Sequence, residues 1–212
     1  EYDGGEGLDE VSYANVAGNI TADLEAGTVI SSKFGITGKV VDRIIDIEQI
    51  SGTASDDKFY SIEGQQDIFF DGRGNNTYVN QLGQTVNGRD TVDFSNYSNG
   101  VTINFTGAGT ASVTDGLGGT IALVGIEEII GTNAGDIITG NTGTNWLKGN
   151  GGVDVLSGGD GDDILEGGVG NDNLSGGDGN DTYYYRIGNH NDVITDSDGT
   201  GDRIYFDGTY IF

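Results

Sequence analysis

An apolar side chain returns at every ninth residue between Gly131 and Tyr184. This stretch divides into six nonapeptides in one register, GTNAGDIIT, GNTGTNWLK, GNGGVDVLS, GGDGDDILE, GGVGNDNLS and GGDGNDTYY. The first position is always glycine, the sixth is aspartate or asparagine, and the eighth is apolar. The residues at the eighth position are Ile138, Leu147, Leu156, Leu165, Leu174 and Tyr183. A fixed short period of this kind predicts a repeat architecture.

Each nonapeptide predicts a glycine-rich loop followed by a very short strand. Glycines at positions one, two and four are expected to adopt positive φ and to turn the chain sharply. The last residues alternate in polarity, which is typical of a strand with one buried face. If two nonapeptides form one turn, the sixth-position side chains stack in two columns on opposite edges of a coil of parallel strands. The columns are Asp136, Asp154 and Asp172, and Asn145, Asp163 and Asp181.

A longer period runs through the whole chain. Residues 7–24 (GLDEVSYANVAGNITADL) resemble residues 88–105 (GRDTVDFSNYSNGVTINF), and residues 44–53 resemble residues 123–132. Alternating apolar positions in these segments predict inserted strands that are longer than those of the nonapeptides. The fold class expected is all-β, a parallel β-roll in two tandem modules. The modules are predicted at residues 1–87 and 88–185, with a capping segment at residues 186–212.

Weaker nonapeptides occur in the first module, at residues 52–60, 62–70 and 71–79. Their sixth positions include Asp57 and Asp67, but only part of the glycine pattern survives. Residues 4–11 also look like a nonapeptide loop and strand. The first module is therefore interpreted as a β-roll with degenerate repeats.

Negative charge concentrates in the regular repeats. The formal net charge is −25, and residues 131–185 contain nine acidic side chains and one base, Lys148. Fixing the backbone of nine residues costs roughly 1–2 kcal/mol each, whereas one buried side chain contributes only roughly 1.5–3 kcal/mol. Carboxylates stacked at the strand spacing also repel one another. A cation between the loops is expected, and an all-oxygen flexible cage favours calcium over magnesium or zinc.

The predicted calcium ligands are sixth-position side chains, their counterparts elsewhere, and loop glycines. The side chains are Asp9, Asp57, Asp67, Asp136, Asn145, Asp154, Asp163, Asp172, Asp181, Asp192 and Asp202. The glycines are Gly131, Gly149, Gly151, Gly158, Gly161, Gly167, Gly170, Gly176 and Gly179. For Asp192 and Asp202 a purely capping role is the preferred alternative. A solvated acidic face is the alternative for the whole set.

Six nonapeptides in phase resemble the RTX repeats of haemolysin-type secreted proteins, whose pattern is GGxGxDxUx with U apolar. The agreement is closest at residues 158–184. Residues 90–100 and the strand after them resemble the β-roll of serralysin-type proteases, and mannuronan epimerases and large adhesins carry similar modules. The resemblance implies several bound calcium ions, type I secretion from a Gram-negative cell, and folding outside the cell when calcium binds.

Several other functions are disfavoured by composition. Nucleic acids and anionic membranes attract basic patches, which this acidic chain does not have. No run of 18 apolar residues predicts membrane insertion, and the absence of cysteine excludes a disulfide framework. No enzymatic activity is expected, because the only histidine, His190, belongs to no HExxH motif and the repeated carboxylates have equivalent surroundings.

Two further functions remain open. An adhesin module could bind a cell-surface glycan or polysaccharide by stacking sugar rings on Trp146 and Tyr184, both expected to point outward. The preferred alternative for Trp146 is packing on the strands that precede Gly131. The chain could also be the non-catalytic C-terminal domain of a secreted hydrolase or epimerase. It begins within an apparent repeat, so it is expected to be part of a larger secreted or cell-surface protein.

Overall fold

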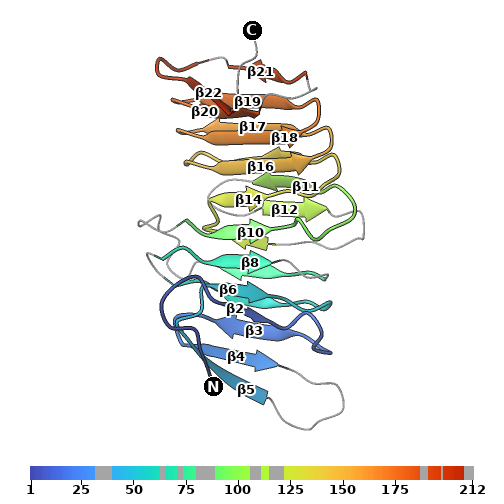
Figure 1. Cartoon of the computed structure of the whole chain (residues 1–212), viewed down its shortest axis with the longest axis vertical. Helices are drawn as coiled ribbons and strands as arrows, with labels where there is room; N and C mark the ends of the chain where they lie inside the picture. Colours follow the sequence, from blue (N-terminus) through green and yellow to red (C-terminus); the bar gives the residue numbers. More distant parts are fainter. Residues whose placement is uncertain are drawn as a thin grey trace.

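The chain folds into short strands that stack along one axis, with the two termini at opposite ends (Figure 1). The computed structural model describes residues 1–31, 40–62, 65–70, 74–79, 89–105, 111–114, 122–186, 191–196 and 198–207. Among these residues there is no helix, and so none that is long and apolar enough to cross a membrane. The prediction of an all-β chain is confirmed, and the parallel sheets are those of a β-roll.

The described strands form three sheets. The seven-stranded sheet contains, in spatial order, β1 (Tyr2–Asp3), β5 (Val40–Ile45), β4 (Thr28–Ser31), β3 (Ile20–Asp23), β7 (Lys58–Tyr60), β9 (Thr77–Val79) and β13 (Ala122–Val124). The nine-stranded sheet contains β2 (Glu10–Ser12), β6 (Gln49–Ser51), β8 (Ile68–Phe70), β10 (Thr91–Asp93), β14 (Glu128–Ile130), β16 (Trp146–Gly151), β18 (Ile164–Val169), β20 (Thr182–Arg186) and β22 (Arg203–Asp207). The six-stranded sheet contains β12 (Ala111–Thr114), β11 (Thr102–Phe105), β15 (Ile137–Thr139), β17 (Val155–Asp160), β19 (Asn173–Asp178) and β21 (Val193–Thr195).

Strand pairing in the regular repeats follows a period of two nonapeptides. Leu147 of β16 lies opposite Leu165 of β18, and Leu156 of β17 lies opposite Leu174 of β19. Successive nonapeptides alternate between the nine-stranded and the six-stranded sheet. One turn of the roll therefore holds two nonapeptides, and successive loops lie on opposite edges.

Two antiparallel insertions interrupt this parallel pattern. β4 pairs antiparallel with both β3 and β5 near the N-terminal end, and β12 pairs antiparallel with β11 in the middle of the molecule (Figure 1). The prediction that the inserted strands are longer than the repeat strands is wrong for β3, β4, β11 and β12. These have four residues, whereas β16 to β19 have six. The repeat strands continue into the glycine positions because stacked loops pair in register, as Gly159 does with Gly177.

The sheets run without a break across the predicted module boundary at residues 87 and 88. β8 pairs with β10, and β9 pairs with β13. The two halves also contain matching pairs, since β2 pairs with β6 as β10 pairs with β14. The division into modules at residues 1–87, 88–185 and 186–212 stays a prediction.

One column of apolar side chains fills the space between the sheets. All six eighth-position residues of the regular repeats are buried, from Ile138 to Tyr183. In the N-terminal half the same position holds Phe59, Phe69 and Tyr78, whose ring centroids lie 4.9–5.5 Å apart. Aromatic rings bury more apolar area than leucine, so the core contributes more to the stability of the strands that hold Phe59, Phe69 and Tyr78.

We expect Leu156→Ala to lower the free energy of unfolding by about 2–5 kcal/mol, because it leaves a cavity in the column. Val155 is the matched control, since it is the preceding residue of the same strand and is 40% exposed. Val155→Ala should cost less than about 1 kcal/mol. Urea unfolding in saturating calcium measures both values, and equal losses would contradict a single buried face.

Candidate metal-binding loops

The sixth-position side chains of the regular repeats lie inside the loops. The side chains of Asp136, Asp154, Asp163, Asp172 and Asp181 have no exposed surface, and Asn145 is 2% exposed. Buried carboxylates are rare unless they are paired, hydrogen-bonded or bound to a metal. The hydrogen-bond partners of each carboxylate therefore decide whether its loop has an oxygen left for a metal ion.

One oxygen of each carboxylate joins two turns of the roll. The backbone N–H of Asp136 donates to Oδ1 of Asp154 over 2.8 Å, and that of Asp154 donates to Oδ1 of Asp172 over 2.9 Å. On the other edge, the N–H of Asn145 donates to Asp163 over 2.7 Å, and that of Asp163 donates to Asp181 over 2.8 Å. The two columns expected from the period are present, and hydrogen bonds run along both.

The second oxygen is left without a protein partner in three of the loops. Oδ2 of Asp154, Asp163 and Asp181 is buried and accepts no hydrogen bond. A buried charged oxygen that is left unsatisfied is costly. These atoms therefore form positions where a cation would replace the missing partner.

The first-position glycines make room for these carboxylates. A Cβ atom on Gly149, Gly158 or Gly176 would collide with Oδ2 of the aspartate five residues later. The expected positive φ at position one is wrong, because none of the six first-position glycines has it. Glycine is required there by the close approach of the carboxylate.

The expected positive φ is confirmed for the glycines at position two, and at position four for Gly152, Gly161 and Gly179 but not for Gly143 and Gly170. Gly159 at position two has a φ of 114°, and Gly152 and Gly161 at position four have φ values of 122° and 114°. The sequence prediction named Gly151 as a ligand glycine, but Gly151 lies at position three, and Gly152 makes the turn that Gly161 makes one nonapeptide later. The other predicted glycines lie at positions one and four of the loops.

Two loops are closed by threonine. In the loop before Asp136, the N–H of Thr132 donates to Oδ2 over 2.7 Å and its hydroxyl donates to Oδ1 over 3.0 Å. In the loop before Asp57, the N–H of Thr53 donates to Oδ2 over 2.6 Å and its hydroxyl donates to Oδ1 over 2.9 Å. Both oxygens of each carboxylate have protein partners, so the geometry gives these two predicted ligands no oxygen that needs a cation.

The column that contains Asp163 extends through the whole molecule. At each step, the residue that follows one member donates its N–H to the carbonyl oxygen of the member one turn earlier, as in the bond from Thr91 to Asp67 of 2.8 Å. The members are Asp9, Glu48, Asp67, Asp90, Glu127, Asn145, Asp163, Asp181 and Asp202. Glu48, Asp90 and Glu127 were missed by sequence reasoning, because the inserted strands change their spacing. The match between residues 44–53 and 123–132 was the available signal for the two glutamates.

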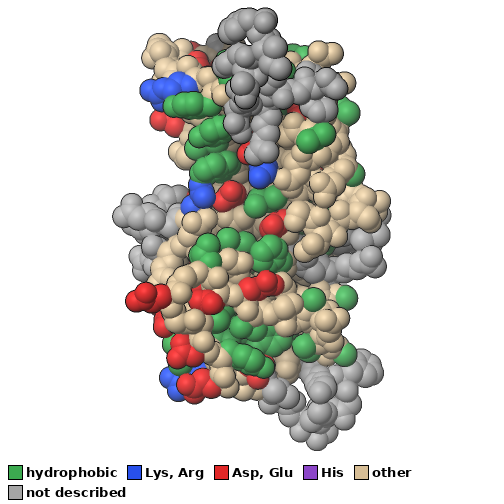
Figure 2. All heavy atoms as spheres, in the orientation of Figure 1, with side chains coloured by type: hydrophobic (Ala, Val, Ile, Leu, Met, Phe, Trp, Pro, Cys, Tyr) green, Lys and Arg blue, Asp and Glu red, His purple; other side chains and the backbone are tan. Residues whose placement is uncertain are grey.

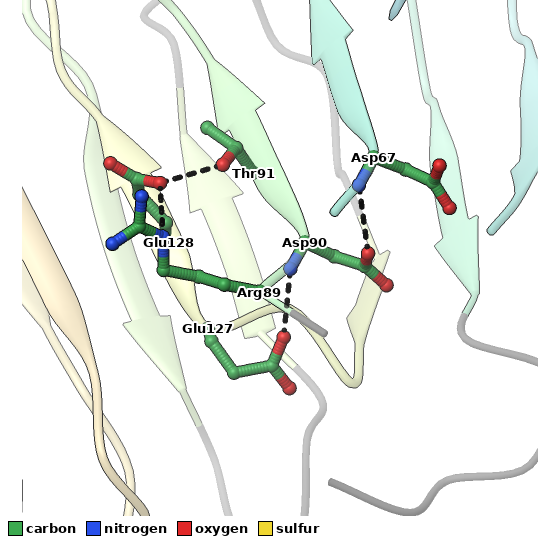
Figure 3. A network of polar contacts seen from close by, with 6 residues as sticks. All are labelled: Asp67, Arg89, Asp90, Thr91, Glu127 and Glu128. Carbon is green, nitrogen blue, oxygen red and sulfur yellow. Dashed lines mark hydrogen bonds and ion pairs between the residues drawn. The ribbon is translucent and has the colours of Figure 1, made fainter. Parts of the chain in front are cut away.

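Figure 3 shows this column at the junction between the N-terminal half and the regular repeats. The N–H of Asp67 donates to Asp90 over 3.3 Å, and the N–H of Asp90 donates to Glu127 over 3.0 Å. Burial, reinforced by the charge of Asp90, raises the pKa of Asp67 to about 7 and that of Glu127 to about 7. Oδ1 of Asp67 is buried and accepts no hydrogen bond.

Among the described residues, Arg89 forms its ion pair with Glu128 and not with the column carboxylates Asp67, Asp90 and Glu127. It forms an ion pair of 3.0 Å with Glu128, which also accepts a hydrogen bond from Thr91 (Figure 3). Its guanidinium lies 3.8 Å from the centre of the Trp146 ring, a cation–π distance. Trp146 is half-buried on the outer side of β16, where this arginine covers one face of its ring.

The remaining predicted residues lie at the two ends. Oδ2 of Asp9 is buried and unpartnered. Asp192 and Asp202 each accept the N–H of the preceding column member, Asp172 over 3.0 Å and Asp181 over 3.1 Å. Tyr184 is 36% exposed and stacks on Tyr205, with ring centroids 5.4 Å apart. His190 lies outside the described residues.

A comparison with known protein families matches residues 130–165 and 157–189 to the RTX calcium-binding nonapeptide repeat, in four copies. Residues 130–189 are RTX calcium-binding repeats. The resemblance inferred from the sequence is confirmed for this stretch, and RTX repeats bind several calcium ions per array. A comparison with curated proteins found no match.

The loops fit calcium in their donor chemistry. The unpartnered carboxylate oxygens of Asp154, Asp163 and Asp181 lie beside the first-position glycines of their loops, and the carbonyl oxygen of Gly167 lies next to Gly149 in the loop of Asp154. Calcium prefers such all-oxygen, flexible surroundings. In the RTX repeats these aspartates would hold the ions, whereas the threonine-closed loop of Asp136 satisfies its own carboxylate.

Burial also changes the protonation of these aspartates. Desolvation raises the pKa of Asp154 to about 7 and that of Asp163 to about 7, although each accepts a backbone N–H that favours the charged form. Like charges one turn away, Asp136 and Asp172 for Asp154 and Asp181 for Asp163, add to the rise. Protons and calcium therefore compete for the same oxygens.

We expect Gly152→Ala to destabilise the calcium-loaded repeats by at least about 1–3 kcal/mol, because a non-glycine residue is strained there. Its Cβ would also collide with the backbone of Ala134 and Gly135. Gly151→Ala is the matched control, since its Cβ would meet nothing closer than 3.6 Å. Urea unfolding in calcium measures the difference, and an equal cost at both positions would be inconsistent with this loop geometry.

The raised pKa values predict an unusual pH dependence. Without calcium, the folded repeats bind protons more tightly than the unfolded chain, whose aspartates titrate near 4. The free energy of unfolding should therefore rise as the pH falls from 8 to 5.5, through the folded pKa of about 7. With calcium the trend reverses, because apparent affinity falls over the same range.

Circular dichroism in chelator and calorimetric calcium titration measure the two trends. Asp154→Asn removes one titrating group and should flatten both curves. A calcium-free chain that loses β structure on acidification would contradict the prediction.

Proposed function

We propose that the chain is a calcium-dependent folding module of a protein exported from a Gram-negative bacterium by type I secretion, and that the module itself does no catalysis. The observation that carries the proposal is the unpartnered, buried Oδ2 of Asp154, Asp163 and Asp181. Without a cation these oxygens oppose folding, and with one they favour it. The same chain is therefore unfolded or folded according to the calcium around it.

The concentrations on the two sides of a bacterial envelope fit such a switch. Extracellular calcium modules have dissociation constants of roughly 10⁻⁴–10⁻³ M, far above cytosolic calcium. An ion present at about tenfold its dissociation constant stabilises the folded state by about 1.4 kcal/mol. Several ions sum to a stability comparable with that of a small domain. A chain that is unfolded before export can pass through a narrow secretion channel, and it folds outside the cell when calcium binds.

Calcium dependence should be strongest in residues 140–186. The loops there contain the unpartnered oxygens of Asp154, Asp163 and Asp181, whereas the N-terminal half has those of Asp9 and Asp67, and the core of residues 140–186 contains leucine. The N-terminal half has the aromatic group of Phe59, Phe69 and Tyr78, and its loop at Asp57 is closed by Thr53. We propose that this half keeps part of its structure without calcium.

Glycan binding is the second candidate function, and Tyr184 is its stronger site. Tyr184 and Tyr205 form a stacked pair on the outer side of β20 and β22, 36% and 50% exposed. Figure 2 shows apolar side chains spread along the viewed face of the molecule, with several acidic side chains toward its N-terminal end. Trp146 suits sugar stacking less well because it is half-buried and Arg89 lies over its ring. Aromatic faces of this kind would serve an adhesin, and Tyr205→Ala on a glycan array tests that function.

The main test is a calcium titration of chelator-treated chain, followed by far-ultraviolet circular dichroism, with magnesium as the control. We expect a cooperative gain of β signal at roughly 10⁻⁴–10⁻³ M calcium and little change with magnesium. A β spectrum that is already complete in chelator would contradict the folding switch.

Asp163→Asn should raise the calcium concentration at the midpoint by about threefold to tenfold, because it removes the charge of a buried, unpartnered oxygen. Asp160→Asn is the matched control, since Asp160 belongs to the same loop and carries the same charge but is exposed. Its midpoint should move by less than about twofold, as expected for a screened surface charge. Equal shifts would indicate that net charge alone controls folding.

A further inference from the structure

The strand β22 is the last strand of the nine-stranded sheet among the residues that the structure describes. It pairs in parallel with β20 along one side. It lies with β21, the last strand of the six-stranded sheet, at the C-terminal end of the roll (Figure 1). An apolar strand at a sheet edge is a template for pairing with another chain, and soluble proteins usually cover it or interrupt it with charge.

The core column ends at this strand with side chains that meet solvent. Ile204 lies opposite Tyr183, so it occupies the eighth position of the column, yet it is 47% exposed whereas Tyr183 is 1% exposed. Phe206 lies opposite Tyr185 on the same face of the sheet and is 51% exposed. The inner face of β22 therefore offers apolar area that a further strand could bury.

The outer face of β22 is aromatic as well. Tyr205 lies opposite Tyr184, with ring centroids 5.4 Å apart, and is 50% exposed. The middle of β22 is thus apolar on both faces. The charged residues of this strand are confined to its two ends, Arg203 and Asp207.

The sequence of β22 is complementary to itself when it is read in the opposite direction. Residues 203–207 are RIYFD. If two copies pair antiparallel about Tyr205, a base at residue 203 lies opposite an acid at residue 207 at both ends. Ile204 of one copy then lies opposite Phe206 of the other. Pairs of opposite charge and pairs of apolar residues both stabilise antiparallel strands.

The backbone of β22 is oriented for this register. The N–H of Arg203 donates to the carbonyl oxygen of Asp181 over 2.8 Å, so it points toward β20. Backbone groups alternate in direction along a strand, and those of Ile204 and Phe206 therefore point away from β20. In the register about Tyr205 these two residues face each other and form the hydrogen-bonded pairs of an antiparallel ladder. A slip of one residue would oppose backbone groups that point in opposite directions.

The other end of the roll fits β22 less well. There the seven-stranded sheet extends beyond β3 by the strands β4, β5 and β1, whereas the nine-stranded sheet ends at β2, so the end is stepped (Figure 1). The C-terminal end has no such step among the described residues, since the two sheets end on the consecutive strands β21 and β22. Two C-terminal ends can close on each other, and antiparallel pairing keeps their acidic loops at residues 196–202 at least roughly 17 Å apart, the length of a five-residue strand.

We propose that two copies of this chain associate through β22, about a two-fold axis at Tyr205, so that the nine-stranded sheet continues from one copy into the other. The pairing joins the two core columns through Ile204 and Phe206. It also places the Tyr184–Tyr205 stacks of both copies in one row on the outer face. Two-fold dimers are the commonest closed assemblies of identical chains. Because β22 pairs with β20 of the RTX repeats, the dimer rests on the proposed folding with calcium.

Sedimentation equilibrium of the full chain in saturating calcium should show a species with twice the mass of one chain. Tyr205→Glu places two like charges directly opposite each other across the axis, so it should raise the dissociation constant by at least about tenfold. Tyr184→Glu is the matched control, since Tyr184 has the same orientation one strand further from the axis. Its two copies would lie three strand spacings apart, about 14 Å, beyond the screening length of about 8 Å. The dissociation constant of this control should change by less than about twofold.

A charge exchange tests the register and does not depend on Tyr205. Arg203→Asp brings two acidic residues opposite each other at both ends of the paired strands and should weaken the dimer. Adding Asp207→Arg restores opposite charges and should recover most of the loss, as a double-mutant cycle measures. Circular dichroism in calcium shows whether each variant is folded. A lack of rescue in a folded double variant would exclude this register.

A wild-type chain that is folded in calcium but remains monomeric would overturn the dimer and would leave calcium-dependent folding intact. A mass that keeps rising with concentration would indicate open end-to-end stacking and would also overturn the two-fold arrangement. Retention of the dimer in Tyr205→Glu would do the same. A dimer that persists in chelator would support the contact through β22 and contradict the calcium switch, so the two proposals can fail separately.

Discussion

The structure depends on a carboxylate that must be buried in order to join one turn to the next. The backbone N–H of each column member points at the side chain one turn later, and Asp154 and Asp163 supply the acceptor. A carboxylate has two oxygens, and the bond between turns uses only one. The other determines the chemistry of the loop, because it must be satisfied by protein, by a proton or by a cation. The glycine at position one follows from the same constraint, since any side chain there would occupy the space that the carboxylate needs.

The regular part of the molecule could be predicted because its period is constant. A constant period sets which residues face each other, so the core leucines and both columns followed from counting. Glu48, Asp90 and Glu127 escaped the same reasoning. Their hydrogen bonds to column neighbours span 39, 23 and 37 residues where the regular repeats have 18. The closure of Asp136 by Thr132 was also missed. In the sequence, a threonine at position two only weakens the glycine pattern, and its hydrogen bond to the carboxylate becomes visible in the structure.

The two halves of the roll balance the same loss of conformational entropy in different ways. In the N-terminal half, aromatic rings at the eighth position increase the apolar area buried per turn, and hydrogen bonds satisfy Asp57. In the regular repeats, leucine buries less, and the carboxylates are left for a ligand to complete. The N-terminal half should therefore depend less on bound ions than the regular repeats, although Oδ2 of Asp9 and Oδ1 of Asp67 also lack a protein partner. The strand pairing itself is the same throughout, which explains why the sheets cross the junction without a break.

The threonine-closed loop at Asp136 lies at the boundary between these two regimes. Roll proteins behave as linear arrays, in which each unit is stabilised by its nearest neighbour. Asp136 already has both oxygens satisfied, and its N–H is directed to Asp154 of the first loop that needs an ion. The turn at Asp136 is thus complete without an ion, and its N–H donor offers the next turn a position on which to pair. Because folding of such an array can nucleate at any unit and spread to its neighbours, this turn can hold a neighbouring loop in its paired form before that loop binds an ion.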